Sequence, residues 1–377
     1  MNKNILITGG AGFIGSNLTL RLIAKGYNVT VMDNLSPQVH EKGEFSPSYL
    51  SIKDKVSFIK GDVRNISDWE KAIQHQHIVV HLAAETGTGQ SMYEISQYVE
   101  VNVQGTANLL HYLTNFKHSI EKVVVASSRA VYGEGKYFCG EHGTVYPNER
   151  REIDLQNGQF DCTCPICGNI VELRATDENS RLHPASVYGI TKQSQEQIVL
   201  TVCKSLAIPA IAFRYQNVYG PGQSLSNPYT GILSIFSTQI KNNNEINIFE
   251  DGKESRDFVY IYDAVDATIL GIENNNITSD IFNVGAATPI DVLTVAQTLL
   301  REYDSTVACA ITGNFRLGDI RHNYADLTKT RALLGYEPKY HFEEGISRFA
   351  EWVNEQEIKE DNFNKSILEM KEKGLFK

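Results

Sequence analysis

The sequence predicts an α/β protein with a doubly wound parallel sheet, a smaller C-terminal domain and a cysteine-rich insertion. Short apolar runs alternate with amphipathic stretches over residues 1–130, which is the pattern of a parallel sheet with helices on both faces. The first apolar run, 4–8, leads directly into a glycine-rich turn, as in Rossmann-type folds. Beyond residue 136 these repeats give way to a polar segment that contains four cysteines.

The chain has 377 residues, which is long enough for two or three domains. We expect a cofactor-binding Rossmann core over 1–136, a zinc-ribbon-like insertion over 137–180 and the rest of the core over 181–215. A mainly substrate-binding domain follows over 216–357, interleaved with Rossmann elements near 258–274. A charged tail, 358–377, completes the chain.

Strands are predicted where short apolar runs are bounded by turn residues, namely at 4–8, 28–33, 56–60, 77–82, 121–127 and 208–213. Helices are predicted where apolar residues recur at helical spacing, namely at 13–25, 67–74, 92–116, 185–207, 229–242, 262–274, 290–303 and 343–356. The charged tail is expected to be helical or frayed.

The net charge is −10, which argues against nucleic acid or an anionic membrane as a partner. A phosphorylated ligand would therefore have to be held by local arginines and backbone amides. No apolar run approaches the length of a membrane-spanning helix, and the N-terminus opens into a strand instead of a signal peptide. We therefore expect a cytoplasmic location.

The turn after the first strand has the features of a dinucleotide site. Gly9 allows a tight turn, Gly12 lets the backbone approach a pyrophosphate, and Gly15 lets the next helix pack closely on the strand. The phosphates would lie at the N-terminus of that helix, where unpaired N–H groups favour negative charge. Asp33 ends the second apolar run, where a carboxylate binds the adenosine ribose and repels a 2′-phosphate. NAD is therefore expected rather than NADP.

Tyr188 and Lys192 lie four residues apart and therefore share one face of a predicted helix. The nearby cation and the positive nicotinamide ring would lower the pKa of the phenol and make Tyr188 a candidate general base. The predicted strand 121–127 runs into Ser128, whose hydroxyl would bond to the substrate hydroxyl that Tyr188 deprotonates. Ser128, Tyr188 and Lys192 are the predicted catalytic residues.

These motifs resemble the extended short-chain dehydrogenase/reductase family, and within it the NAD-dependent nucleotide-sugar epimerases and dehydratases. The resemblance extends over nearly the whole chain except the cysteine segment. It rests on the glycine loop, Asp33, Gly61-Asp62, the stretch 81–84, Ser128, the Tyr188/Lys192 pair and the segments 214–222 and 255–259.

The resemblance implies a set of cofactor contacts and a set of contacts to a nucleotide-diphosphate sugar. NAD would be held by Gly9, Gly12, Phe13, Ile14, Gly15, Asp33, Asn34, Asp62, Val63, Leu82, Ala83, Ala84, Asn102, Tyr188, Lys192 and Tyr215. The substrate would be held by Thr88, Gln90, Ser91, Ser128, Arg129, Asn217, Phe249, Arg256 and Arg316. Asn217 and the last two arginines would bind the diphosphate. The alternatives are that these two arginines are solvated surface residues and that loop 86–91 binds no ligand.

The residues after Ser128 indicate which reaction of the family applies. In the 4,6-dehydratases this position is followed by two acids, which eliminate water, whereas this chain has Arg129 and Ala130. A cation and a methyl group do not form an acid/base pair, so dehydration is disfavoured. A reductase would more often use NADPH, which Asp33 disfavours. We therefore expect a 4-epimerase, which oxidises C4 transiently and returns the hydride to the opposite face.

Two other functions stay open. One is a nucleotide-sugar 4-ketoreductase or dehydratase of the same family, and the other is a non-catalytic NAD-sensing or scaffold protein. The helical stretches 92–116 and 185–207 resemble the paired helices through which family members form dimers, so a homodimer is expected. Their apolar faces could equally belong to the internal core.

The cysteine segment contains two chelating pairs. Cys164 and Cys167 have the spacing of a zinc knuckle, and Cys139 and His142 repeat that spacing. We expect one structural zinc bound by these four residues, because four protein ligands leave no open coordination position. Cys162 is a competing fourth ligand, and a reducing cytosol disfavours disulfides. The insertion, together with segments 85–92 and 214–217, resembles the branch of the family whose epimerases act on dTDP-L-rhamnose.

Overall fold

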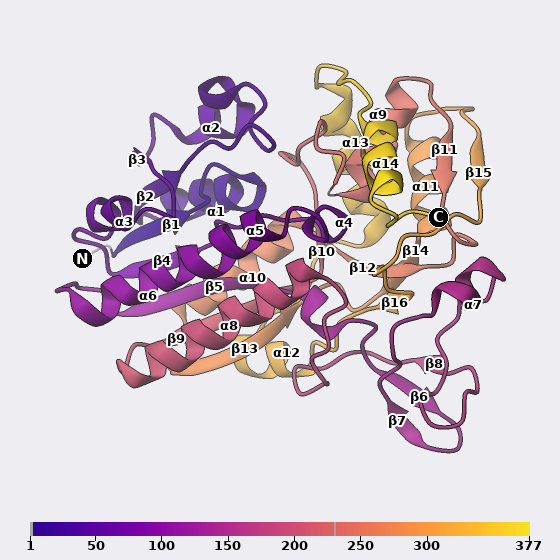
Figure 1. The fold of residues 1–377 in the computed structure, drawn as a ribbon. Helices are drawn as coiled ribbons and strands as arrows, with labels where there is room; N and C mark the ends of the chain where they lie inside the picture. Colours follow the sequence, from indigo (N-terminus) through magenta and orange to yellow (C-terminus); the bar gives the residue numbers. More distant parts are fainter. Residues whose placement is uncertain (1–2, 230) are drawn as a thin grey trace.

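The central sheet has seven strands, all parallel, in a computed structural model that describes residues 3–229 and 231–377 (Figure 1). Its order is β13-β9-β5-β4-β1-β2-β3. The strands are β1 (Asn4–Thr8), β2 (Asn28–Asp33), β3 (Ser57–Lys60), β4 (Ile78–His81), β5 (Lys122–Ser128), β9 (Ala210–Tyr215) and β13 (Ser279–Val284). The predicted parallel α/β architecture is confirmed, and only β13 lacks a counterpart among the predicted strands.

The order in which successive strands are added to the sheet reverses between β1 and β4. From β1 the sheet continues through β2 to β3 on one side, and from β4 through β5, β9 and β13 on the other. The connections leaving β1 and β4 therefore diverge, and a crevice opens at their carboxyl ends. In doubly wound sheets this is where ligands bind.

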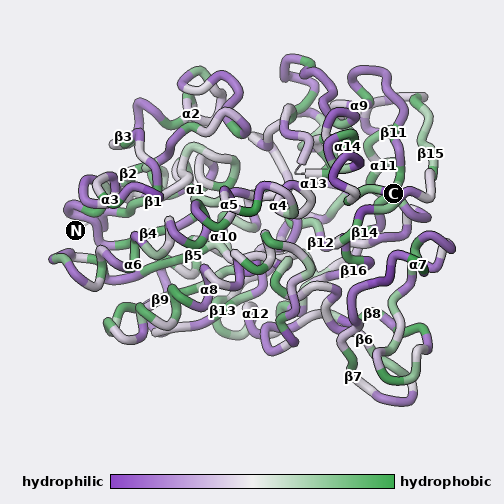
Figure 2. Tube along the Cα trace, in the orientation of Figure 1, coloured by the Kyte–Doolittle hydropathy of each residue, from purple (hydrophilic) through white to green (hydrophobic). Residues whose placement is uncertain are grey.

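Alternating side chains of each strand enter two separate cores, as the two-residue period of a strand requires. Ile5 and Ile7 of β1 pack on one face with helices α1 (Phe13–Ala24) and α10 (Ile261–Glu273). Leu6 packs on the other face with α3 (Ile66–Ala72), α6 (Gly105–Asn115) and α8 (Val187–Ser205). Every residue of β5 and β9 is buried, and Figure 2 shows hydrophobic colour over much of β5.

The predicted helix 92–116 is divided into several turns in the structure. α4 (Thr88–Ser91) and α5 (Ile95–Tyr98) precede a π-helical turn, Val99–Gln104, that leads into α6. The wider turn contains Asn102, whose buried side chain bonds to Glu85 and to Thr191 on α8. Hydrophobic periodicity does not reveal such a turn, and π-bulges often occur at functional sites.

The C-terminal part adds two small sheets and several helices beside the carboxyl ends of the large sheet (Figure 1). The sheets consist of β10 (Asn217–Tyr219), β12 (Ser255–Tyr260), β14 (Pro289–Asp291) and β16 (His322–Asn323), and of β11 (Ile246–Ile248) with β15 (Cys309–Ile311). The helices are α9 (Ile232–Lys241), α11 (Val292–Glu302), α12 (Thr328–Leu334), α13 (Phe342–Asn354) and α14 (Phe363–Glu372). The predicted helices in this part are confirmed within three residues, and the tail is helical.

The segment 137–180 forms a small antiparallel sheet of order β7-β6-β8. Its elements are β6 (Tyr137–Cys139), β7 (Gly143–Val145), β8 (Glu172–Leu173) and the short helix α7 (Glu152–Gln156). It lies apart from the large sheet, at the lower right of Figure 1.

None of the helices in the two described ranges is both long and apolar enough to cross a membrane.

Candidate active site

A cavity of about 910 Å³ occupies the crevice at the carboxyl ends of β1, β2, β4 and β5. Most of the expected cofactor residues line it, namely Gly9, Gly12, Phe13, Ile14, Gly15, Asp33, Asn34, Val63, Leu82, Ala83, Ala84, Tyr188, Lys192 and Tyr215. Four expected substrate residues line it as well, namely Thr88, Ser128, Arg129 and Asn217. The cavity is therefore shared between the large sheet and the C-terminal part of the chain.

The glycine loop leaves no space for side chains. Gly9 has a φ of +67°, and a Cβ there would lie 2.8 Å from the amide nitrogen of Ala83. A Cβ on Gly15 would lie 2.2 Å from the carbonyl oxygen of Gly9. Gly12 is the N-cap of α1 and has no side chain to cap the helix, so unpaired N–H groups stay available for a diphosphate. The loop fits a dinucleotide.

Asp33 is held in a fixed orientation at the end of β2. One carboxylate oxygen accepts from the backbone N–H of Ala11 at 3.0 Å, and the other accepts from that of Leu35 at 2.9 Å. The His40 ring lies 3.7 Å from the same carboxylate. Burial lowers the pKa of His40, although Asp33 opposes the shift. A neutral imidazole supplies no charge for a 2′-phosphate, so this end of the cavity suits NAD.

Two expected cofactor residues lie behind the wall of the cavity. Asp62 accepts from Arg64 through both oxygens and from Asn34 at 3.1 Å. The Arg64 hydrogen bonds lower the pKa of Asp62 to about 2. Asn102 is fully buried and ties the loop after β4 to α8. Both residues are arranged to position the groups that line the cavity.

Tyr188 lies in the first turn of α8, which Ser186 caps by accepting from the Gly189 N–H at 3.1 Å. The backbone N–H of Tyr188 donates to Ser91 at 3.0 Å, which ties the helix to the loop 86–91. Burial raises the pKa of the Tyr188 phenol. A hydrogen bond with Ser128 and the charge of Arg129 act in the opposite direction.

Lys192 is buried and points toward β5. Its Nζ donates to the Ala126 carbonyl and to Gln195, both at 2.8 Å, and burial lowers its pKa to about 7. The expectation that Lys192 lowers the pKa of Tyr188 is therefore not met in this structure, where Arg129 is the cation that does so. Gln195 was not expected at the site, although its position three residues after Lys192 on α8 could have indicated it.

Arg129 and Asn217 bring the two halves of the site together. Arg129 Nε donates to Asn217 Oδ1 at 2.9 Å. Burial and the like charge of Arg256 lower the pKa of Arg129 to about 9. Arg256 donates to the carbonyls of Ile320 and Arg321 at 2.7 and 2.9 Å. In the described ranges neither Arg129 nor Arg256 forms an ion pair with a carboxylate, and Arg129, unlike Arg256, lines the cavity.

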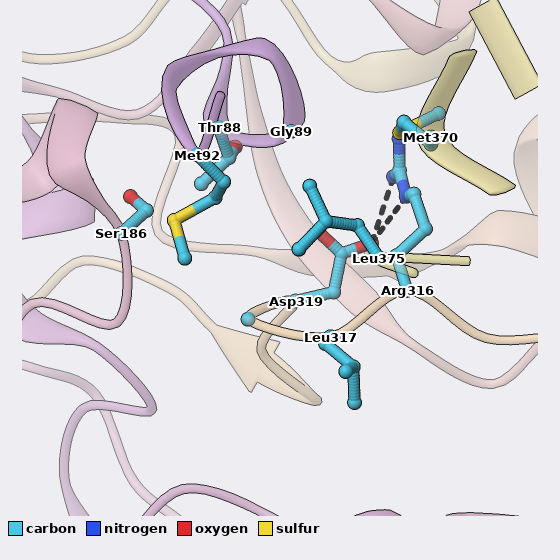
Figure 3. A pocket seen from close by; sticks show the side chains of 10 residues that line it. Thr88, Gly89, Met92, Ser186, Arg316, Leu317, Asp319, Met370 and Leu375 are labelled. Carbon is cyan, nitrogen blue, oxygen red and sulfur yellow. Dashed lines mark hydrogen bonds and ion pairs between the residues drawn. The ribbon is translucent and has the colours of Figure 1, made fainter. Parts of the chain in front are cut away.

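Other expected substrate residues have partners within the protein. Gln90 exchanges hydrogen bonds with Gln38 and does not line the large cavity. Arg316 pairs with Asp319 at 2.8 Å (Figure 3) and lies over the ring of Phe249. Phe249 packs against Phe363 and Phe376 of the C-terminal segment, with ring centroids 6.1 and 5.1 Å apart. No sequence pattern predicts that Phe363 and Phe376 pack over Phe249.

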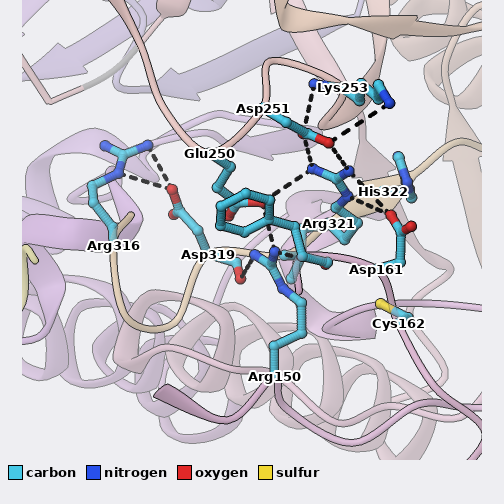
Figure 4. Close-up of polar contacts among 12 residues, drawn as sticks. Arg150, Asp161, Cys162, Glu250, Asp251, Lys253, Arg316, Asp319, Arg321 and His322 are labelled. Carbon is cyan, nitrogen blue, oxygen red and sulfur yellow. Dashed lines mark hydrogen bonds and ion pairs between the residues drawn. The ribbon is translucent and has the colours of Figure 1, made fainter. Parts of the chain in front are cut away.

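A buried charge network joins the insertion to the C-terminal part (Figure 4). Arg150 pairs with Glu250 at 2.7 Å and with Glu134 at 3.3 Å. Arg321 pairs with Glu250, Asp251 and Asp161. The side chains of Arg150, Glu134 and Glu250 are at most 5% exposed. The network orients the loop that carries Arg316 and the carbonyl that holds Arg256, because Arg321 lies five residues after Arg316 and its carbonyl oxygen accepts from Arg256.

Cys139, His142, Cys164 and Cys167 form a compact cluster whose ligand atoms all lie within 4.8 Å of one another. Cys139 Sγ is 3.6 Å from His142 Nδ1 and 3.7 Å from Cys167 Sγ. Tetrahedral zinc with bonds of about 2.3 Å to sulfur and 2.0 Å to nitrogen requires ligand separations of about 3.5–3.8 Å. The cluster therefore fits a metal ion. Cys162 lies outside it and donates to the Tyr137 hydroxyl at 3.5 Å.

Comparisons with known proteins agree with this geometry. The family model described as "NAD dependent epimerase/dehydratase family" matches residues 5–150 and 161–285. The dTDP-L-rhamnose 4-epimerase of Burkholderia thailandensis is 36% identical over 94% of this chain and 96% of that protein. A putative UDP-glucose 4-epimerase of Methanocaldococcus jannaschii is 30% identical over 93% of this chain and 98% of that protein.

Solved structures of similar proteins share the fold. UDP-glucuronic acid 4-epimerase from Bacillus cereus, in complex with UDP-glucuronic acid and NAD, has a TM-score of 0.76 at 25% identity, covering 93% of this chain and 99% of that one. UDP-glucose 4-epimerase from Thermotoga maritima, with UDP-glucose, has a TM-score of 0.74 at 29% identity, covering 93% and 98%.

Proposed function

Because this chain belongs to the NAD-dependent epimerase/dehydratase family, we propose that it is a nucleotide-sugar 4-epimerase, with a dTDP-hexose such as dTDP-L-rhamnose as substrate. The observation that carries the proposal is the meeting of Ser128, Arg129 and Tyr188 at one wall of the shared cavity. Ser128 and Tyr188 are suited to the reversible oxidation of a secondary alcohol. Arg129 occupies a position at which a dehydratase needs an acid.

NAD is the cofactor that the residues fit best. The glycine loop would hold its diphosphate, Asp33 its adenosine ribose, and Lys192 and Tyr188 its nicotinamide ribose. When bound, NAD supplies a hydride acceptor and, once reduced, a hydride donor for C4 of the sugar. The remaining work belongs to the side chains of the chain itself.

Tyr188 takes the proton from the C4 hydroxyl as the carbon is oxidised and returns it after the sugar has turned. Ser128 keeps the oxygen at C4 within hydrogen-bond reach of Tyr188 in both orientations. Arg129 and Asn217, which line the cavity, bind the diphosphate, and Arg256 adds positive charge beside Arg129. Anchoring the diphosphate leaves the hexose free to rotate, and the opposite face of C4 then receives the hydride.

We also propose that Cys139, His142, Cys164 and Cys167 hold a structural zinc ion that makes the insertion a zinc ribbon. The separations between their ligand atoms suit tetrahedral coordination, and four protein ligands leave no position for substrate. All six cysteines are free of disulfide bonds, which suits a reducing compartment. We accordingly propose that the enzyme works in the cytoplasm.

A homodimer is proposed from the surface of the helices near the site. Ile95, Val99 and Ile190 are 50%, 43% and 52% exposed, and they lie on α5, the π-helical turn and α8, which contact one another. Pairing this surface with its copy would bury these side chains. Analytical ultracentrifugation of the purified protein tests this proposal.

A panel of dTDP-, UDP- and GDP-sugars tests the proposed activity. The configuration at C4 is followed by NMR while absorbance at 340 nm reports reduced cofactor. An epimerase interconverts the C4 epimers without net change in absorbance. A ketoreductase of the same family would instead consume reduced cofactor with a 4-keto sugar, and a non-catalytic protein would change neither signal.

A further inference from the structure

A second, smaller cavity lies between the loop 86–92 and the C-terminal segment (Figure 3). Its volume is about 10 Å³, which is room for one group of about the size of a water molecule. Thr88 lines this cavity and the large one, so the two adjoin. Ser186 also lines the small cavity. It is the N-cap of α8, and Tyr188 follows it by two residues. The small cavity is thus beside the place where C4 would react.

The far wall of the cavity is apolar. Met92 faces Leu375 across the gap (Figure 3), and Leu317 and Met370 also line the cavity. Some of the polar groups around it already have partners: the Ser186 hydroxyl accepts from the Gly189 N–H, and the Arg316 guanidinium pairs with Asp319. A hydroxyl group placed against the side chains of Met92, Met370 and Leu375 would find no hydrogen-bond partner among them.

We propose that this cavity receives the C6 methyl group of a 6-deoxyhexose, and that Met370 and Leu375 thereby determine substrate specificity. This inference rests on the proposed 4-epimerase function. C6 is bonded to C5, the neighbour of C4, so it lies within two bonds of the reacting carbon. A methyl group fills the space and meets only apolar atoms on the far wall, whereas a hydroxymethyl group is too long and too polar.

The charge of the cavity excludes a carboxylate at C6. The guanidinium of Arg316, the cation of this cavity, is held by the Asp319 carboxylate at 2.8 Å. A uronic acid would bring a second carboxylate to a guanidinium that already has one, so the pair offers it no uncompensated positive charge. This chain therefore differs in substrate class from the Bacillus cereus relative solved with UDP-glucuronic acid.

The positions of Met370 and Leu375 in the small cavity depend on the contacts that hold the C-terminal segment. The backbone N–H of Leu317 donates to the Leu375 carbonyl at 3.0 Å, and that of Phe315 donates to the Lys377 carbonyl at 3.1 Å. Buried Met370 lies in α14, and its sulfur approaches Gly89 of the substrate loop so closely that a Cβ there would be 3.1 Å away. Residues at the end of the chain thus complete a site built near its beginning.

A matched pair of substrates tests the inference with the full chain and NAD. The two dTDP-sugars have the same configuration and differ only in methyl against hydroxymethyl at C6. We expect kcat/KM to favour the methyl sugar by about 10–100-fold, which is the range for one polar group in an apolar pocket. Met370→Ala should enlarge the cavity and reduce this preference several-fold. Leu368→Ala, on the same helix but 60% exposed, should leave it unchanged.

The possible failures are distinguishable. Equal kcat/KM for the two sugars would overturn the C6 assignment while leaving the epimerase function intact. Absence of C4 epimerisation with every sugar would overturn the proposed function itself. Calorimetric titration of the two sugars into the wild-type protein needs neither turnover nor a variant. It should give a lower Kd for the methyl sugar, and equal Kd values would overturn the assignment.

Discussion

Arg129 Nε donates to Asn217 Oδ1 at 2.9 Å, which joins the end of β5 in the large sheet to β10 of the C-terminal part. The two residues are far apart in sequence, yet both line the cavity that contains Tyr188. This bond aligns the chemistry at C4, which depends on the sheet, with diphosphate binding, which depends on the C-terminal part.

Replacement of Tyr188 by Phe should lower kcat by about 10²–10⁴-fold, the usual contribution of a positioned general base. NAD affinity should stay within a few-fold, because the phenol is only one of many groups that line the cofactor cavity. Steady-state kinetics and fluorescence titration with NAD measure the two effects. Tyr262→Phe, at a tyrosine 41% exposed, is the matched control. Near-normal turnover of Tyr188→Phe would remove this residue from the mechanism.

Replacement of Arg129 by Gln should raise KM for the nucleotide sugar about 10–100-fold, the loss expected for charge-assisted hydrogen bonds to a phosphate. The Kd for NAD should change little. Arg331→Gln removes an exposed arginine that pairs with Glu337 and should leave both constants unchanged. If Arg129→Gln weakened NAD and substrate equally, its proposed role in diphosphate binding would be wrong.

Lys192 should make the stability of the cofactor-free protein depend on pH. Its native pKa, about 7, lies below the unfolded value near 10.4. Between these values the unfolded chain holds a proton that the native protein lacks, so stability rises as pH rises. Relative to Lys192→Met, the wild type should gain up to about 1.4 kcal/mol per pH unit between pH 7.5 and 9.5. Urea denaturation across this range measures the difference, and parallel curves would contradict the low pKa.

The metal cluster predicts different outcomes for two neighbouring cysteines. Cys164→Ser should lose zinc and lower the thermal midpoint, because a structural zinc ion contributes directly to folding free energy. Cys162→Ser should keep one zinc per chain, since its thiol contacts Tyr137 and not the cluster. Metal analysis by mass spectrometry on both purified variants decides the matter. Zinc loss from the Cys162 variant alone would reassign the fourth ligand.

The buried network predicts a large effect of Arg150 on stability. Arg150→Met would leave Glu134 and Glu250 without this cation and should destabilise the protein by about 3–5 kcal/mol. Arg151→Met, at the next residue, which is largely exposed, should not shift the urea midpoint. Equal midpoints for the two variants would show that the network contributes little to folding.

Local sequence patterns are sufficient for six of the seven strands of the large sheet and for the glycine loop. β1 and β2 begin and end at the predicted residues, because an apolar run bounded by turn residues leaves little choice in a parallel sheet. The prediction of one helix over 92–116 lacked the π-helical turn around Asn102. That turn depends on hydrogen bonds to Glu85 and Thr191, which no local pattern encodes.

The candidate site was harder to predict where long-range packing decides the environment. Lys192 was expected to act on the Tyr188 phenol, but Ala126 and Gln195 hold its ammonium group. Phe249 and Arg316 were expected at the substrate, and the structure shows that the C-terminal segment packs against both. Such contacts join segments far apart in sequence, so neither periodicity nor motif spacing indicates them.

The most direct test of the central proposal uses a dTDP-hexose that carries deuterium at C4. We expect the purified protein to invert the configuration at C4 and to keep the label on that carbon, without net change in absorbance at 340 nm. This is the result of a hydride that leaves and returns to the same sugar. Loss of the label to solvent, or inversion with stoichiometric formation of NADH, would contradict the proposed mechanism.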